Sequence, residues 1–294
     1  MIRLAHVSDI HLTTDNLEWQ REDWFNKRMA AWINFRWLGR EKLFRHADAI
    51  IRRLLLEIDE RGPHHIVFSG DATALGFESE LRKAAELLEI DRRPGLATPG
   101  NHDYCTPPAA RSGLFEKHFA PWLKGQRIGD TVYPFAQRVG SVWLVVVNSA
   151  TGNRLFYDAG GAVGPEQLAR LRDLLARLEG GPRILVTHYP VAIKSGKKET
   201  WGRGLRDLSD VVQVAADGGV SLWLHGHRHG SYFLERPLDA PFPAICAGSA
   251  TQVGVWSYGE YTIDGARLHA VRRDFNLERG VFEDKEEFTL ELKN

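Results

Sequence analysis

Imidazole, carboxylate and amide side chains gather in five short motifs along this chain of 294 residues. The motifs are Asp9-x-His11, Gly70-Asp71, Gly100-Asn101-His102-Asp103, Thr187-His188 and Gly226-His227-x-His229. Imidazole nitrogen and carboxylate oxygen bind transition ions such as Mn, Fe, Zn and Co. The motifs supply seven candidate ligands, more than one ion needs: Asp9, His11, Asp71, Asn101, His188, His227 and His229. Two ions that share a carboxylate would use the whole set, and such a pair suits phosphoryl transfer.

Each motif by itself also has an ordinary structural explanation. The pairs at 9–11 and 70–71 fit surface turns, the triplet at 101–103 fits a turn closed by local hydrogen bonds, and His188 fits a capping histidine. The strongest single motif is 226–229, because two histidines that flank one residue after a buried run rarely occur without a ligand role. The occurrence of all five together favours the metal interpretation.

Each motif follows a short apolar run that predicts a buried strand. These runs cover residues 4–7, 66–68, 96–98, 184–186 and 222–224, and a further run covers 142–147. Helical patterns at 45–61, 78–90 and 165–178 lie between the runs, and strands that alternate with helices predict an α/β layered fold. Because ligands in open α/β sheets sit at the carboxyl ends of the strands, we expect the five motifs to meet there.

The sequence changes character after residue 230. Runs at 231–234, 244–247, 258–263 and 268–273 predict consecutive, antiparallel strands. The expected architecture is therefore two packed β-sheets with helices outside. No internal repeat, low-complexity tract or Pro/Gly/Ser linker divides the sequence, so we expect residues 1–294 to form a single domain.

Charge and composition restrict the partners. The 38 Lys and Arg residues balance the 38 Asp and Glu residues, so no long nucleic acid is expected as a substrate. Cys105 and Cys246 lack the close spacing of a zinc motif and are expected to be reduced thiols. The first residues are too polar for a signal peptide, and no apolar run reaches the roughly 18 residues that cross a membrane. A cytoplasmic location is expected, and the oligomeric state is unknown.

In their set and order, the five motifs resemble the motif blocks of the calcineurin-like metallophosphoesterase superfamily. The resemblance covers residues 4–230. It implies a four-layer αββα sandwich of two mixed β-sheets flanked by helices, with a dinuclear centre of divalent or trivalent ions, among which Mn or Fe is favoured. By this likeness one ion is bound by Asp9, His11 and His229, the other by Asn101, His188 and His227, and both by the bridging Asp71.

The resemblance also implies hydrolysis of a small phosphate ester by a hydroxide that bridges the two ions, with a phosphodiester favoured over a monoester. The alternatives are a pyrophosphate hydrolase that acts on a nucleotide or a lipid-linked sugar, and a non-catalytic metal-binding scaffold. Two stretches depart from many relatives, Ala72-Thr73 after the second motif and Tyr189-Pro190 after His188. They leave the candidate ligands intact and bear on the choice of substrate.

The bend at 101–103 follows a Pro-Gly turn and supplies three functional groups at once. Asn101 offers an amide oxygen to a metal. His102 is expected to be catalytic, as the acid that reaches the leaving-group oxygen. Asp103 is expected to hold the His102 ring in the required tautomer.

Residues 13–45 interrupt the core pattern after the first strand. Positions 24–45 hold six Lys or Arg, one Glu and six aromatic residues. This composition fits a cap-like insertion over the active site, which is favoured because the segment directly follows His11. It also fits peripheral contact with an anionic membrane through 24–45. The Gly-rich loop that holds Arg203 and Arg206 either contacts a phosphate or is solvated, and the solvated loop is favoured.

Overall fold

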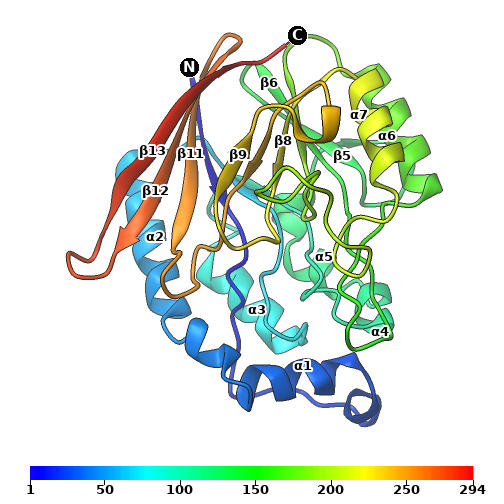
Figure 1. Ribbon diagram of the computed structural model, residues 1–294, viewed down its shortest axis with the longest axis vertical. Coiled ribbons are helices and arrows are strands. Elements are labelled where there is room, and N and C mark those ends of the chain that lie inside the picture. Colours follow the sequence, from blue (N-terminus) through cyan, green and yellow to red (C-terminus); the bar gives the residue numbers. More distant parts are fainter. Residues whose placement is uncertain (294) are drawn as a thin grey trace.

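The computed structural model describes residues 1–293, which form two mixed β-sheets with helices on their outer sides (Figure 1). The first sheet contains β1 (Ile2–Val7), β2 (His65–Phe68), β3 (Gly95–Ala97), β11 (Ser257–Asp264), β12 (Arg267–Asn276) and β13 (Val281–Glu291), in the order β13-β12-β11-β1-β2-β3. The second contains β4 (Gln126–Arg127), β5 (Phe135–Val139), β6 (Val142–Val146), β7 (Arg183–Val186), β8 (Val220–His225), β9 (Tyr232–Leu234) and β10 (Ala244–Cys246), in the order β4-β5-β6-β7-β8-β10-β9. The predicted αββα sandwich is confirmed.

The apolar runs of the sequence form the parallel parts of both sheets. Strands β1, β2 and β3 pair in parallel, and so do β6, β7 and β8. Parallel strands that are covered on both faces are apolar throughout, and for this reason their runs could be recognised in the sequence. Observed and predicted bounds of these strands differ by at most two residues.

Helices fill the connections between the strands. The helical elements are η1 (Arg21–Phe25), α1 (Lys27–Arg36), η2 (Arg40–Leu43), α2 (Ala47–Arg61), α3 (Glu78–Leu87), α4 (Pro107–Arg111), α5 (Leu114–His118), η3 (Ala120–Leu123), α6 (Pro165–Arg177), α7 (Leu208–Asp217) and η4 (Pro237–Asp239). Helix α3 ends before the predicted residue 90 because Glu89 adopts a positive φ of 51°. Within residues 1–293, every helix is too short or too polar to cross a membrane.

The strands after residue 230 divide between the two sheets. The pairs β9–β10 and β11–β12 are antiparallel as predicted, but β10 also pairs with β8 in parallel. The prediction of a simple antiparallel run was wrong in that respect. Strand β13 was not predicted, because its charged sequence FEDKEE hides the alternation. Charged residues are typical of such an edge strand, where they hinder pairing with other chains.

Candidate metal centre

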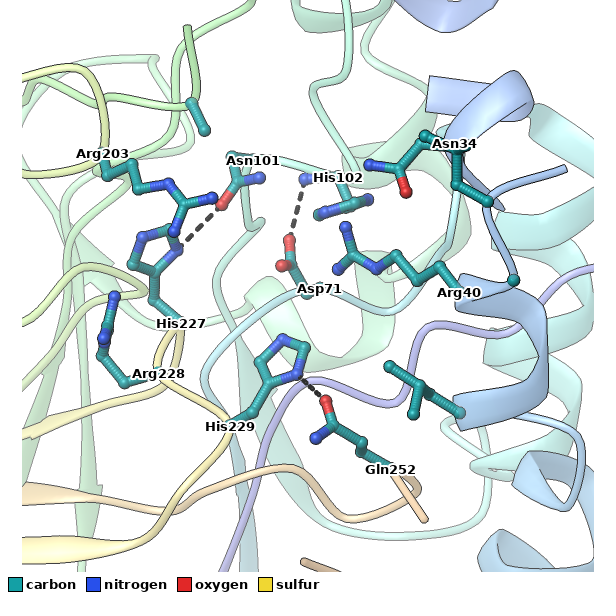
Figure 2. Close-up of a pocket in the computed structure, with 14 residues that line it drawn as sticks. Asn34, Arg40, Asp71, Asn101, His102, Arg203, His227, Arg228, His229 and Gln252 are labelled. Atoms are coloured by element: carbon teal, nitrogen blue, oxygen red, sulfur yellow. Dashed lines mark hydrogen bonds between the residues drawn. The ribbon is translucent and has the colours of Figure 1, made fainter. Parts of the chain in front are cut away.

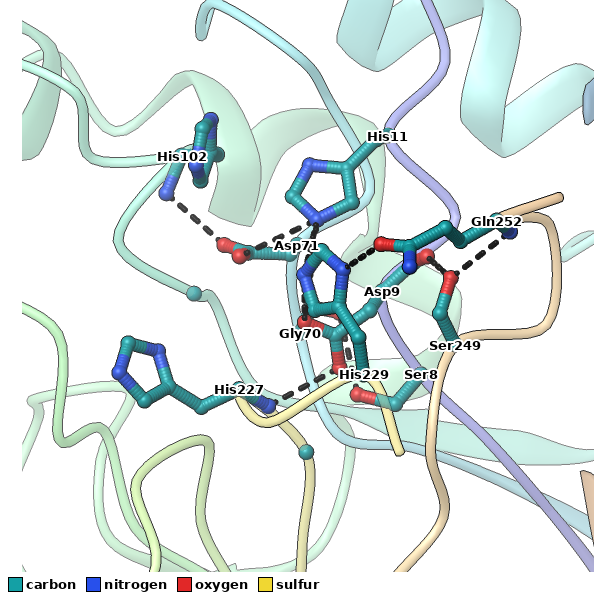
Figure 3. A network of polar contacts seen from close by, with 12 residues as sticks. Ser8, Asp9, His11, Gly70, Asp71, His102, His227, His229, Ser249 and Gln252 are labelled. Atoms are coloured by element: carbon teal, nitrogen blue, oxygen red, sulfur yellow. Dashed lines mark hydrogen bonds and ion pairs between the residues drawn. The ribbon is translucent and has the colours of Figure 1, made fainter. Parts of the chain in front are cut away.

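The five motifs meet at the carboxyl ends of β1, β2, β3, β7 and β8. Figures 2 and 3 show residues of every motif except Thr187-His188. Strands β1 to β3 belong to the first sheet, and β7 and β8 belong to the second, so the cluster straddles both sheets. The backbone N–H of His227 crosses this junction and donates to Asp9 Oδ2 at 3.0 Å. The expectation that strand ends bring the motifs together is therefore met by the geometry.

Asp9, His11 and His229 form a first group of candidate ligands. The Nε2 atoms of His11 and His229 lie 3.0 Å apart. Asp9 Oδ1 lies 3.8 Å from Nε2 of His11 and 3.3 Å from Nε2 of His229. Three donor atoms of suitable chemistry thus converge on one point.

Asn101, His188 and His227 form a second group. Asn101 Oδ1 lies 3.2 Å from His188 Nε2 and 2.9 Å from His227 Nδ1. The two ring nitrogens lie 3.3 Å apart. This group is as tightly convergent as the first.

The carboxylate of Asp71 lies between the two groups. Its Oδ2 is 3.7 Å from His11 Nε2 in the first group and 3.4 Å from His188 Nε2 in the second. Its Oδ1 accepts the backbone N–H of His102 at 2.8 Å, which fixes the carboxylate orientation. Asp71 therefore occupies the position that a shared ligand requires.

The donor set fits a pair of transition ions. Asp9 Oδ1 is buried and accepts no hydrogen bond from any group within residues 1–293. A buried carboxylate oxygen in that state is costly unless a cation binds it. Imidazole nitrogens together with carboxylate and amide oxygens are ligands that Mn, Fe, Zn and Co accept.

Hydrogen bonds behind two of the rings fix which nitrogen faces the cluster. His188 Nδ1 donates to the Ser69 carbonyl at 2.8 Å. His229 Nδ1 bonds the Gln252 amide oxygen, as Figure 3 shows. In both rings Nε2 is left to face the centre, an arrangement typical of metal-binding histidines.

Backbone strain is concentrated at the cluster. Among non-glycine residues within 1–293, eight have a positive φ, and five of these are candidate ligands. Those five are Asp9 (53°), His11 (42°), Asp71 (57°), His227 (68°) and His229 (45°). Such a backbone costs an L-residue about 1–3 kcal/mol, and this kind of strain marks functional sites.

Two motif glycines are required by close approach rather than by φ. A Cβ on Gly100 would lie 2.1 Å from Asp71 Oδ1. A Cβ on Gly226 would lie 1.9 Å from Ser8 Oγ. Any side chain at these positions would therefore displace the loops that carry the candidate ligands.

Burial and neighbouring charges set the protonation of the cluster. Burial lowers the pKa of His11 to about 4 and that of His227 to about 3, so both rings are neutral near pH 7, the form that binds metal. Burial also lowers the pKa of His188, but the adjacent Asp71 carboxylate outweighs it and raises that pKa to about 9. For Asp71, burial raises the pKa, but His188 and His102 lower it well below its usual range, so the carboxylate is ionised.

His102 lines the same cavity, but Asp103 does not hold its ring. His102 Nδ1 donates to the Ala74 carbonyl at 2.6 Å. Asp103 instead accepts from the Gly100 N–H at 2.8 Å and from the Thr73 N–H and hydroxyl at 3.0 Å. The expected role of Asp103 was wrong, because the bend turns this carboxylate back to tie two loops together. With Nδ1 engaged, the free nitrogen of His102 is Nε2, and it can donate only when the ring is doubly protonated.

His102 also lies close to two candidate ligands. Donor atoms of His11, Asp71 and His102 all lie within 4.8 Å of one another. Burial lowers the pKa of His102 well below its ordinary value, and the nearby Arg40 guanidinium acts in the same direction. An anionic group bound beside the ring would act in the opposite direction.

Sequence reasoning missed Gln252 and Arg40. Both line the cavity that contains the candidate ligands. Gln252 follows no recognisable motif, and Arg40 is one of several basic residues in 24–45, so neither had a distinctive local signal. The loop that holds Arg203 and Arg206 was predicted to be solvated. In the structure Arg203 lines the cavity, whereas Arg206 pairs with Asp158 at 2.6 Å.

Residues 13–45 lie against the body of the protein beside the cavity. The Arg28 guanidinium donates to the carbonyls of Leu75 and Gly76 at 3.1 Å and 2.8 Å. Lys27 Nζ donates to the Asp158 carbonyl at 2.7 Å. Two of the six basic side chains in 24–45 therefore anchor the segment internally.

The segment also carries exposed aromatic side chains. Phe25 is 94% exposed, Trp37 is 76% exposed and Trp24 is 55% exposed. Phe35 and Phe44, by contrast, are buried. The segment thus combines side chains that pack on the protein with aromatic side chains that remain exposed.

Comparison with known proteins identifies the family. The family model for calcineurin-like phosphoesterases matches residues 2–231, which contain all five motifs. The chain belongs to this family, whose chemistry is the metal-dependent hydrolysis of phosphate esters. A search of curated proteins found no match.

Solved structures share the fold at low sequence identity. A dimetal phosphatase from Danio rerio has a TM-score of 0.69 at 11% identity, and the match covers 99% of each chain. A purple acid phosphatase from yellow lupin, Lupinus luteus, has a TM-score of 0.60 at 13% identity, over 99% of this chain and 53% of that one. GAP50, the anchor in the inner membrane complex of Plasmodium, has a TM-score of 0.58 at 12% identity, over 100% and 89%. At these identities the likeness establishes the fold and leaves the substrate open.

Proposed function

We propose that the protein hydrolyses small phosphodiesters with two cations held by the seven clustered side chains. Asp9, His11 and His229 hold one cation, and Asn101, His188 and His227 hold the other. The observation that carries this proposal is the position of Asp71, within 3.7 Å of a ring nitrogen of one group and 3.4 Å of a ring nitrogen of the other. Manganese or iron is the favoured ion.

Two cations bound there would supply positive charge for the phosphoryl oxygens and would lower the pKa of water towards neutrality, which would make hydroxide available as the nucleophile. In the overall step, a P–O bond forms from water and the P–O bond to the leaving alcohol breaks. His102, which lines the cavity, donates the proton that the leaving oxygen takes up, in the doubly protonated form that an anionic phosphoryl group bound beside the ring would favour. Asp71 Oδ1 positions the His102 backbone for this task through the 2.8 Å hydrogen bond.

The size of the cavity supports a diester over a monoester. The space around the candidate ligands has a volume of about 680 Å³, and it is lined by residues from both sheets and from the segment 13–45. A diester needs room on two sides of the phosphorus atom, whereas a monoester needs it on one. A pyrophosphate linkage has the same requirement and is the nearest alternative.

The test compares hydrolysis of bis-p-nitrophenyl phosphate and p-nitrophenyl phosphate by protein loaded with Mn and by protein stripped with a chelator. We expect turnover only in the loaded protein, with the diester as the faster substrate. Faster turnover of the monoester would overturn the diester preference alone. Absence of turnover with Mn, Fe, Zn and Co would favour the scaffold alternative.

We also propose that residues 13–45 cap the site, and that their outer face contacts an anionic lipid surface as a separate, weaker role. The cap role is supported by Arg28, which bonds the loop after β2, and by Arg40, which lines the cavity. The lipid role is supported by the exposed Phe25 and Trp37, since aromatic side chains favour the membrane interface.

A further inference from the structure

The cavity over the candidate metal centre adjoins a second space beneath α1. This second space has a volume of about 420 Å³. Its walls include Ala30, Ala31, Phe35, Leu38, Phe156 and Tyr157, which are apolar or aromatic. The boundary between the two spaces is marked by the seven residues that line both of them: Asn34, Leu38, Arg40, Asn101, His102, Ala159 and Arg203.

The boundary holds two arginines, Arg40 and Arg203, and neither forms an ion pair within residues 1–293. The side chains of Arg40 and Arg203 make no hydrogen bond or ion pair to any protein group there, whereas Arg228 pairs with Glu199 at 2.5 Å and Arg206 pairs with Asp158. Figure 2 shows the Arg40 side chain reaching toward Asp71 and His102. A guanidinium group that lines a cavity and forms no ion pair with a carboxylate is suited to an anionic ligand such as a phosphoryl group.

The location of His102 indicates where the leaving group of the substrate lies. The proposed function makes His102 the donor to the leaving-group oxygen, so the leaving group must lie on the side of this ring. His102 borders the space beneath α1. The group that departs therefore enters a compartment with mainly apolar walls, while the phosphoryl group stays beside the polar cluster.

We propose that the segment 13–45 completes the substrate site in two ways. Arg40, with Arg203, binds the phosphoryl oxygens at the boundary between the two spaces. The space beneath α1 accommodates an apolar leaving group, either an aryl group or a compact alkyl group. This inference rests on the proposed function, which it extends from phosphate esters in general to esters of apolar alcohols or phenols.

The experiment measures the affinity of three non-hydrolysable probes for Mn-loaded protein by calorimetry. The probes are inorganic phosphate, methylphosphonate and phenylphosphonate. We expect phenylphosphonate to bind about tenfold more tightly than methylphosphonate, because only its ring reaches the apolar space. Equal affinities of these two probes would overturn the assignment of the apolar space.

Substitutions separate the two parts of the site. Arg40→Gln should weaken all three probes by roughly 10- to 100-fold, because each loses the same charge-assisted hydrogen bonds. The control is Lys42→Gln, which removes an exposed charge from the same turn η2. Equal affinities in Arg40→Gln and Lys42→Gln would overturn the role of Arg40.

Phe156→Ala and Tyr157→Ala test the apolar space. Both side chains are largely exposed, at 71% and 64%, so folding should tolerate their truncation. We expect each variant to lose several-fold in affinity for phenylphosphonate and none for inorganic phosphate. Unchanged affinity for phenylphosphonate in both would contradict the proposal. If wild-type protein binds the probes as expected but hydrolyses no ester, the proposed function fails and the two-part site stands.

Discussion

The Asp71 carboxylate oxygen Oδ2 lies 3.4 Å from Nε2 of His188, although 117 positions separate the two residues in the chain. Asp71→Asn keeps the shape of this side chain and removes its charge. We expect metal affinity to fall by more than the roughly 10- to 100-fold that loss of an outer hydrogen-bond partner costs. Elemental analysis after Mn loading and desalting measures the effect, with the exposed Asp130→Asn as the control. Full metal content in Asp71→Asn would rule out the shared carboxylate.

His102→Ala should lower turnover by about 10²–10⁴-fold and leave both metals bound. The reduction should grow as the leaving group becomes a poorer one, because only a poor leaving group needs a proton. The measurement compares p-nitrophenyl and phenyl esters in the variant and in wild-type protein. A reduction of equal size for both esters would argue against an acid role, and loss of metal would make His102 a ligand instead.

Gly100→Ala should disrupt the centre, since the added Cβ would lie 2.1 Å from Asp71 Oδ1. We expect loss of tightly held metal and of activity. Gly202→Ala is the matched control, because nothing lies within 4 Å of a Cβ at that position. Metal content and thermal unfolding of both variants provide the readout, and a Gly100→Ala variant that retains two ions would contradict the close approach.

Glu80 should make stability depend on pH. It is buried beside the start of α3, where Oε2 accepts the N–H groups of Leu75 and Phe77 at 3.0 Å and 3.1 Å. Burial raises its pKa from 4.5 to about 7, although these hydrogen bonds, Thr13 and Arg28 act in the opposite direction. Because the folded protein holds this proton more tightly, the contribution is full below pH 4.5 and is lost as the pH rises to about 7.

Glu80→Gln removes this titration. From the two pKa values, the contribution amounts to roughly 3 kcal/mol. Urea unfolding of wild-type protein and variant at pH 5 and pH 8 measures it. We expect the free energy of unfolding to fall with pH more steeply in wild-type protein, and parallel profiles would show that Glu80 titrates normally.

The exposed aromatic face of residues 13–45 predicts sedimentation with vesicles. Wild-type protein should bind vesicles that contain phosphatidylglycerol more strongly than vesicles of phosphatidylcholine alone. The double substitution Phe25→Ser and Trp37→Ser should weaken this binding several-fold without changing hydrolysis of a water-soluble ester. Binding that is absent in wild-type protein, or unchanged in the variant, removes the lipid role and leaves the cap role.

The sequence predicted those parts of the site that follow buried strands. Apolar runs such as 184–186 can be recognised in the sequence because parallel strands are covered on both faces. The polar residue after each run marks the end of the strand, where ligands bind. Arg40 and Gln252 come from segments outside this pattern, so only the fold brings them to the cavity. The contact between Asp103 and Thr73 could not be predicted either, because it depends on how two loops turn.

The positions of the ligands in both sheets have a mechanical consequence. Asp9 and Asp71 follow strands of one sheet and His188 and His227 follow strands of the other, so cations bound by these side chains would link the two sheets at the ends of the strands. Loading the protein with metal should then raise its melting temperature as ligand binding to the native state does. Bound metal should hinder movement of one sheet relative to the other. Removal of the metal by a chelator should restore that movement.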